Sequence, residues 1–137
     1  MSASFKDLRV WQEAMRFTVE IYRATALFPR HELYGLSNQL RRAAVSIPSN
    51  IAEGKGHRSD REFGNFLHHS RGSLLEVQTQ LMIAKELQYI SDEEAQRILA
   101  SADVIGKGLN SLINSLREKA ALRQTTNDER RTTIPNV

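Results

Sequence analysis

Few side chains in this sequence have the types and spacing that metal chemistry requires. The chain has four histidines, His31, His57, His68 and His69, and no cysteine, which excludes thiolate zinc sites and cysteine nucleophiles. No histidine follows a glutamate by three residues, the spacing with which helical bundles hold di-iron centres. His68 and His69 are adjacent, so on a helix their side chains diverge by about 100° and cannot share a metal ion. The sequence therefore predicts no metal site and no cofactor.

The run Gly54-Lys55-Gly56-His57-Arg58 looks like a phosphate-binding loop, but it lacks the Gly-x4-Gly-Lys-Ser/Thr spacing and a preceding strand. Its glycines are typical of a helix end followed by a turn. The basic side chains of this run gather with that of Arg61 at one end of the expected fold, and three more arginines could extend this patch. The candidate nucleic-acid-binding residues are Lys55, His57, Arg58 and Arg61, extended by Arg41, Arg42 and Arg71. The alternative is a solvated turn whose charges form ion pairs within the helices.

Two polar residues, Asn50 and Glu53, lie close to Pro48 in the sequence. Because proline has no backbone N–H, it frees a carbonyl that side chains can bond. We expect Pro48, Asn50 and Glu53 to form a structural motif. Neither polar residue has a nucleophile or a second carboxylate of clear purpose beside it, so no catalytic residue is predicted and the chain is not expected to be an enzyme.

Apolar side chains recur every three or four residues along four segments, which is the period of amphipathic helices. The segments begin near residues 8, 34 to 36, 60 and 92, and they end near residues 27, 53, 87 and 121. Asp7 is the expected N-cap of the first, and Ser59 and Ser91, each followed three residues later by a glutamate, predict capping boxes. Short connections predict antiparallel neighbours, so the predicted fold class is all-α, an antiparallel up-and-down four-helix bundle.

Pro48 falls inside the second of these helices. Its ring clashes with the carbonyl four residues earlier, which predicts a kink or a one-turn break between Ala44 and Pro48. The hydroxyl of Ser46 or Ser49 could bond the freed carbonyl.

The length of 137 residues and the apolar content of 40% allow one compact domain. The bundle is expected to occupy residues 1–121, and polar residues without periodicity predict a flexible C-terminal tail over residues 122–137. No signal peptide and no run of about 18 apolar residues is found, so a cytoplasmic location without membrane contact is expected.

The helices carry more apolar surface than one bundle can bury. The apolar arc of the first helix spans roughly half its circumference, wider than one partner helix covers. Leu75, Met82 and Ile83 lie off the main apolar stripe of the third helix. The candidate subunit-interface residues are Val10, Phe17, Leu75, Met82 and Ile83, and a homo-oligomer is expected.

The sequence closely resembles the four-helix bundle protein family that is often labelled as the protein of 23S ribosomal RNA intervening sequences. The resemblance covers about residues 5 to 116. It rests on Phe5-Lys-Asp-Leu-Arg-Val-Trp11, Gln39-Leu-Arg-Arg-Ala43, Asn50-Ile-Ala-Glu-Gly54 and Arg71-Gly-Ser-Leu74, with shorter matches at Ile21-Tyr22, Phe28-Pro29, Glu32, Gly35-Leu36, Ser46-Ile-Pro48, Phe63, Phe66-Leu67 and Glu76. This resemblance implies a bundle that assembles into a ring-like homopentamer. The family is also distantly similar to the accessory variability protein of diversity-generating retroelements, a basic pentamer that partners a reverse transcriptase.

The net charge of +3 is distributed unevenly, with an excess of +4 through Arg61 and of −1 from Glu62 onward. A modest basic bias permits contact with phosphates without requiring it. The first hypothesis is an oligomeric module that binds RNA or DNA, or docks a nucleic-acid enzyme. The alternatives are a protein-interaction scaffold and a small-molecule binder that uses an interface pocket near Asn50 and Glu53.

Overall fold

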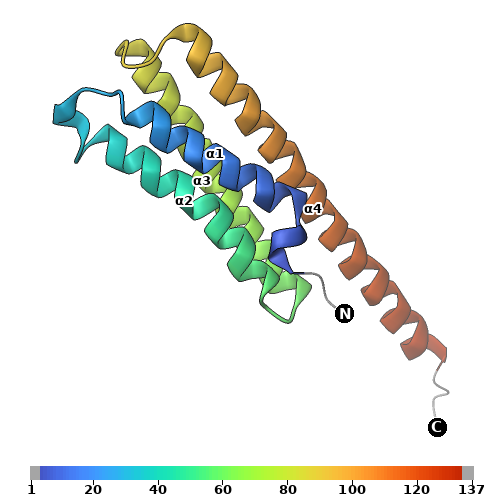
Figure 1. Ribbon diagram of the computed structural model, residues 1–137. Coiled ribbons are helices and arrows are strands. Elements are labelled where there is room, and N and C mark those ends of the chain that lie inside the picture. Colours follow the sequence, from blue (N-terminus) through green and yellow to red (C-terminus); the bar gives the residue numbers. More distant parts are fainter. Residues whose placement is uncertain (1–3, 134–137) are drawn as a thin grey trace.

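The computed structural model describes residues 4–133, which fold into four long helices and two short 3-10 helices, with no strand in that range (Figure 1). The elements are η1 (Phe5–Asp7), α1 (Arg9–Thr25), η2 (Arg30–Glu32), α2 (Leu36–Lys55), α3 (Asp60–Glu86) and α4 (Asp92–Thr133). The predicted all-α class is confirmed. No helix in this range is long and apolar enough to cross a membrane.

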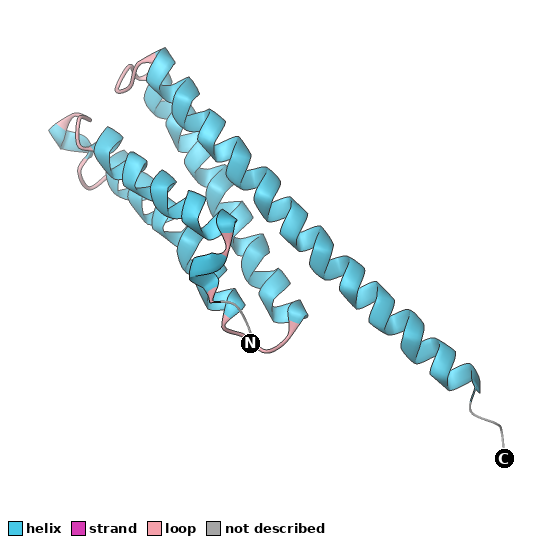
Figure 2. Ribbon diagram, turned by 45° about the vertical axis from the view of Figure 1, so that its right-hand side comes forward, coloured by secondary structure: helices cyan, strands magenta, loops and turns pink. Residues whose placement is uncertain are grey.

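The helices pack in the order α1, α2, α3, α4 around the bundle, so α1 and α3 lie on a diagonal, with no pair of their Cα atoms within 8 Å. Figure 2 shows the long helices side by side, with one of them extending well past the other three. Each helix turns a row of apolar residues at three- and four-residue spacing toward one shared core. The side chains that are fully buried and largest include Phe17, Ile21, Leu40, Ile47, Ile51, Leu67, Leu81, Ile98, Ile105 and Leu109.

Serine caps begin α3 and α4, but only half of each predicted capping box is formed in the described chain. The hydroxyl of Ser59 accepts from the N–H of Glu62 at 3.1 Å, and that of Ser91 accepts from Glu94 at 3.1 Å. The carboxylate of Glu62 contacts the His57 ring and that of Glu94 pairs with Arg97, and neither returns to its cap. The N-cap of α1 was expected at Asp7, but Asp7 forms a capping box with Ser4 around η1.

Helix α2 continues through Pro48 without the predicted one-turn break. Pro48 cannot donate to the carbonyl of Ala44. The single hydroxyl proton of Thr18 on α1 is shared between that carbonyl, at 3.1 Å, and Ala14 O, at 2.8 Å. The bond that proline removes is therefore replaced in part from a neighbouring helix, not by Ser46 or Ser49. A bend at Pro48 stays a prediction.

Helices α2 and α3 approach each other closely near the end of α2. A Cβ atom on Gly54 would lie 2.6 Å from Phe66 Cβ and 3.3 Å from the carbonyl oxygen of Phe63, so only glycine fits there. In the middle of the pair, the buried hydroxyl of Ser70 donates to Ile47 O at 2.8 Å. These contacts fix the position of the loop that joins α2 to α3.

Helix α4 extends well past the bundle, where the sequence predicts a flexible tail. It has 42 residues and a length of about 63 Å, and it continues as far as Thr133. Residues 117–130 are all exposed, and Arg123 pairs with Asp60 of α3 at 3.1 Å. Alanines and long polar side chains favour helix in this segment even without an apolar stripe. Residues 134–137 of the expected tail lie outside the described residues.

Two of the five residues expected at a subunit interface belong to the core. Val10 and Phe17 are 7% and 1% exposed within a single chain, so their assignment to an interface was wrong. Leu75, Met82 and Ile83 are 58%, 54% and 45% exposed on α3. The surplus apolar surface of α1 lies instead at Met15, Val19 and Tyr22, which recur at helical spacing and are exposed. Val10 and Phe17 lie on the flank of the α1 apolar arc that packs into the core, and the other flank remains exposed.

The Thr18 hydroxyl should be important only because residue 48 is proline. We expect Thr18→Val to lower the free energy of unfolding by about 1 to 3 kcal/mol, because it leaves the Ala44 carbonyl unpaired. In a Pro48→Ala background the new N–H of residue 48 bonds that carbonyl, so the same substitution should cost less than half as much. Chemical denaturation of the four variants of this double-mutant cycle measures the difference. An equal cost in both backgrounds would contradict the assignment.

Candidate nucleic-acid interface

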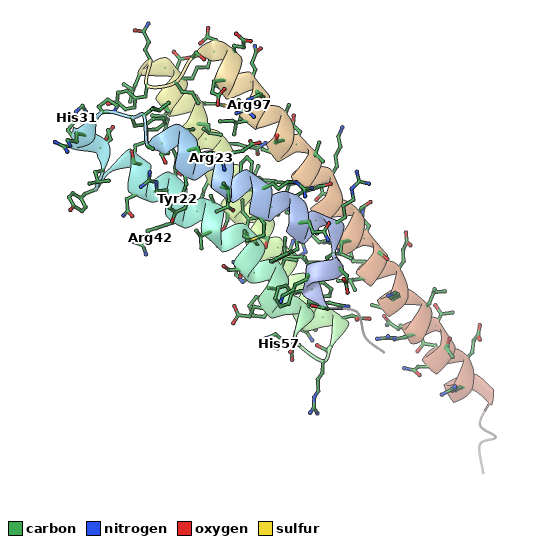
Figure 3. The ribbon with its side chains drawn as sticks, viewed as in Figure 1. Tyr22, Arg23, His31, Arg42, His57 and Arg97 are labelled. Carbon is green, nitrogen blue, oxygen red and sulfur yellow. The ribbon has the colours of Figure 1, made fainter. Side chains whose placement is uncertain are left out.

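The last residue of α2, the α2–α3 loop and the first turn of α3 hold four of the predicted nucleic-acid-binding residues at one end of the bundle. His57 lies at this end in Figure 3, and its Nδ1 is 2.6 Å from Glu62 Oε2, while its ring stacks on Phe66 with 4.9 Å between centroids. Lys55 lies over the Phe63 ring, 5.8 Å from its centroid. Aromatic rings of α3 thus hold the side chains at the start of the loop.

Three cations at this end, Lys55, Arg58 and Arg61, have no carboxylate partner among residues 4–133, and we call them the loop basic surface. Two neighbouring acids are already engaged, since Glu62 contacts His57 and Asp60 pairs with Arg123. The loop basic surface therefore presents three cations that are not held in ion pairs, beside the exposed carboxylate of Glu53 in the last turn of α2.

Arg41 and Arg42 do not join this surface. They lie near the other end of α2, about 20 Å along the helix axis from Lys55, and Figure 3 shows Arg42 far from His57. Arg41 donates to Thr25 Oγ1 at 2.8 Å and to Tyr22 O at 3.3 Å, and its guanidinium lies 4.8 Å from the centre of the Tyr22 ring. Arg41 therefore binds the C-terminal turn of α1, and the predicted single patch is wrong for these two arginines.

Arg71 lies on the side of α3 that faces α4, two to three turns beyond the loop. Its Nη1 donates to Asn110 Oδ1 at 3.0 Å, and its Nη2 donates to His68 Nδ1 at 3.0 Å. These bonds link α3 to α4 and orient His68.

Burial, followed by the positive charges of Arg71, Arg117 and His69, lowers the pKa of His68 below its usual value. The hydrogen bond from Arg71 requires a lone pair on Nδ1, which places the proton of the neutral ring on Nε2. His68 is therefore neutral at pH 7 and still offers one N–H.

Arg117 and Arg123 lie beside the start of α3. Neither was among the residues predicted from the sequence. They belong to the segment of α4 that continues past the apolar heptads. Arg61 and Arg117 lie on the two walls of a groove of about 320 Å³ between α3 and α4. Only recognition that the helix continues past Leu116 could have placed them there.

Asn50 belongs to a polar network that joins α2 to α3. Its Nδ2 donates to Ser46 O at 2.8 Å and to Ser46 Oγ at 2.9 Å, and the Ser46 hydroxyl lies 2.8 Å from that of Ser73. Asn50 thus acts beside Pro48 by fixing Ser46. Glu53 is exposed and has no polar partner within the described part of the chain, so the structure does not bring it into this network.

The described residues contain no group of three or more histidine, aspartate or glutamate side chains close enough to hold a metal ion. What the arrangement offers is hydrogen-bonding and charged side chains on a rigid helical frame.

The fold is that of a small all-α four-helix bundle, and three cations lie at one of its ends. The family model described as 23S rRNA-intervening sequence protein matches residues 6–111, and the chain belongs to that family. The resemblance found in the sequence is thereby confirmed.

One similar solved structure is the crystal structure of a protein with unknown function from the S23 ribosomal protein family of Bacteroides thetaiotaomicron. It is 26% identical to this chain with a TM-score of 0.69, and the match covers 76% of this chain and 97% of that one. The search of curated proteins gave no significant match.

The environment of His68 can be tested by NMR titration. We expect its pKa to lie below the usual 6.5, and Arg117→Gln to raise it because one positive neighbour is removed. The rise should be partial, since burial is the largest cause of the shift. Lys119→Gln, which removes an equal charge two residues away, should leave the pKa unchanged. A His68 pKa above 6.5 in the wild-type protein would contradict this description.

Proposed function

We propose that this chain is a cytoplasmic, non-enzymatic module that assembles into a homo-oligomer and binds RNA through the loop basic surface. The observation that supports RNA binding is the set of three cations at one end of the bundle without local carboxylate partners. Lysine and arginine without local partners can release counterions from phosphates, which is the main source of affinity for nucleic acids.

Assembly is supported by two apolar faces on opposite sides of the bundle. Met15, Val19 and Tyr22 lie on the α1–α2 side, where Arg41 of α2 covers the Tyr22 ring. Leu75 lies on the α3–α4 side, in a hollow shared with Lys107 of α4. Since α1 and α3 are diagonal, one copy can present the first face to the second face of the next copy, a head-to-tail contact that closes into a ring.

Symmetry would repeat the loop basic surface, which binds weakly in a single copy, in every subunit. A pentamer, the state that the family resemblance implies, would have a net charge of about +15 from five copies of +3. Several loop basic surfaces on one rigid ring would contact a single RNA at once, so avidity would replace strong individual contacts.

RNA binding can be tested by fluorescence anisotropy with a structured RNA at two salt concentrations. We expect the triple variant Lys55→Glu, Arg58→Glu, Arg61→Glu to abolish binding at low salt, because it reverses the charge of the whole loop basic surface. The matched control Arg16→Glu, Arg30→Glu, Arg42→Glu makes the same charge change at exposed sites away from the loop and from the Leu75 hollow, and it should retain most of the affinity. Equal affinity of wild type and the loop variant would reject the proposal and favour a protein-interaction scaffold.

Assembly can be tested by sedimentation of two single-face variants. Wild type should sediment at about five times the subunit mass of 15.6 kDa, while Val19→Glu and Met82→Glu should each give monomers. A mixture of the two variants should form one-to-one dimers, because each retains the face that the other has lost. A monomeric wild type would overturn the assembly, and a mixture that stays monomeric would overturn the head-to-tail contact.

A further inference from the structure

A groove between α3 and α4, near the loop end of the bundle, combines an apolar floor with cationic walls. Its floor is formed by Ile113, Leu116 and Ala120 of α4, and its volume is about 320 Å³. Ile113 and Leu116 are anchored in the core at 2% and 7% exposed, so this part of the floor is held by core packing. Pockets that bind small molecules usually start at about 300 Å³ and have mainly apolar linings.

The groove stays open because the wall on α3 includes a glycine. A Cβ atom on Gly64 would meet no other atom within 4 Å, so the space above the floor has no side chain in it from this position. Glycine costs about 1 kcal/mol relative to alanine inside a helix, and neither close packing nor a positive φ requires it here. The absence of a side chain at Gly64 therefore leaves the volume above the floor open.

The charges around the groove favour an anion. Arg61 on α3 and Arg117 on α4 have no carboxylate partner among the described residues. The acid in the lining, Asp60, is paired with Arg123 at 3.1 Å. Neutral His68 adds an N–H donor, and the lowering of its pKa by Arg71 and Arg117, after burial, is consistent with a positive potential at this place.

We infer that this groove binds an acyl chain that ends in a single carboxylate. The chain would lie on the floor of Ile113, Leu116 and Ala120, where each square ångström of apolar surface removed from water contributes about 25 cal/mol. The planar guanidinium of Arg117 or Arg61 would hold the carboxylate through paired N–H bonds. RNA fits the groove less well, because no aromatic side chain lines it to stack on a base.

The ligand class can be tested by calorimetric titration of the full chain with three probes. Sodium octanoate should bind with measurable heat, because it supplies both the chain and the carboxylate. Acetate lacks the chain and octylamine reverses the charge, so neither should bind. Binding of acetate as strongly as octanoate would show a simple anion site, and binding of octylamine would show an apolar site without charge selection; either result overturns the inference.

Two pairs of variants locate the site. A Cβ atom on Gly64 or on Gly72 meets no atom within 4 Å, so a larger side chain can start at either position. Gly64→Leu places its side chain in the groove and should weaken octanoate binding by more than tenfold, whereas Gly72→Leu, the same change on the same helix outside the groove, should have no effect. Arg117→Gln should weaken binding by about tenfold, and Lys119→Gln should not. Equal octanoate affinity in wild type and Gly64→Leu would overturn the inference.

The same variants separate this inference from the proposed RNA binding. Gly64→Leu leaves Lys55, Arg58 and Arg61 in place, so it should retain RNA affinity while it loses octanoate. If RNA binding fails in wild type but octanoate still binds, the groove stands alone. Loss of both ligands in Gly64→Leu with an unchanged circular dichroism spectrum would instead assign the groove to RNA.

Discussion

A hydrogen bond from α1 reaches the carbonyl that Pro48 leaves free, and α2 runs unbroken past it. Without the Thr18 hydroxyl, the Ala44 carbonyl would lack a donor, at a cost of about 1 to 3 kcal/mol. The continuous helix sets the geometry of everything at its ends. Arg41 is held against the last turn of α1, while Lys55 is about 20 Å away at the loop. The unbroken helix thus keeps Arg41, which binds the last turn of α1, apart from the loop basic surface, which faces solvent.

The order of the helices around the core also determines which surfaces remain uncovered. A residue on α1 or α3 can be covered by α2 and α4 but not by the opposite diagonal helix. Each diagonal helix is therefore left with an outer apolar strip, at Val19 on one side and at Leu75 and Met82 on the other. The polar network of Asn50, Ser46 and Ser73 occupies the α2–α3 side, and the groove above Ile113 opens on the α3–α4 side. The proposed assembly faces, the polar network and the groove thus lie on different helix pairs or at different ends of one.

Apolar periodicity was enough to predict the four helices and the all-α class, because core burial repeats with the helical period. It misassigned Val10 and Phe17, since a sequence shows how wide an apolar arc is but not which part of it the neighbouring helices cover. The candidate cations could be chosen by type, yet their grouping depended on the unbroken α2, which the sequence alone predicts against. The site at Arg117 was missed because a helix that leaves its core no longer has an apolar stripe to mark it.

The projecting part of α4 has a thermodynamic consequence of its own. Side chains from 117 to 130 are exposed, so this stretch gains its helical order from local propensity and a few surface contacts, not from a shared core. Isolated helices of about 15 residues are marginal in water. Amide protons in the middle of α4, upstream of Leu116, will therefore exchange with solvent only on larger-scale opening of the bundle, whereas those downstream will exchange by fraying, progressively faster away from the Asp60–Arg123 pair. A single helix thus spans two regimes of local stability, and the boundary between them lies beside the groove.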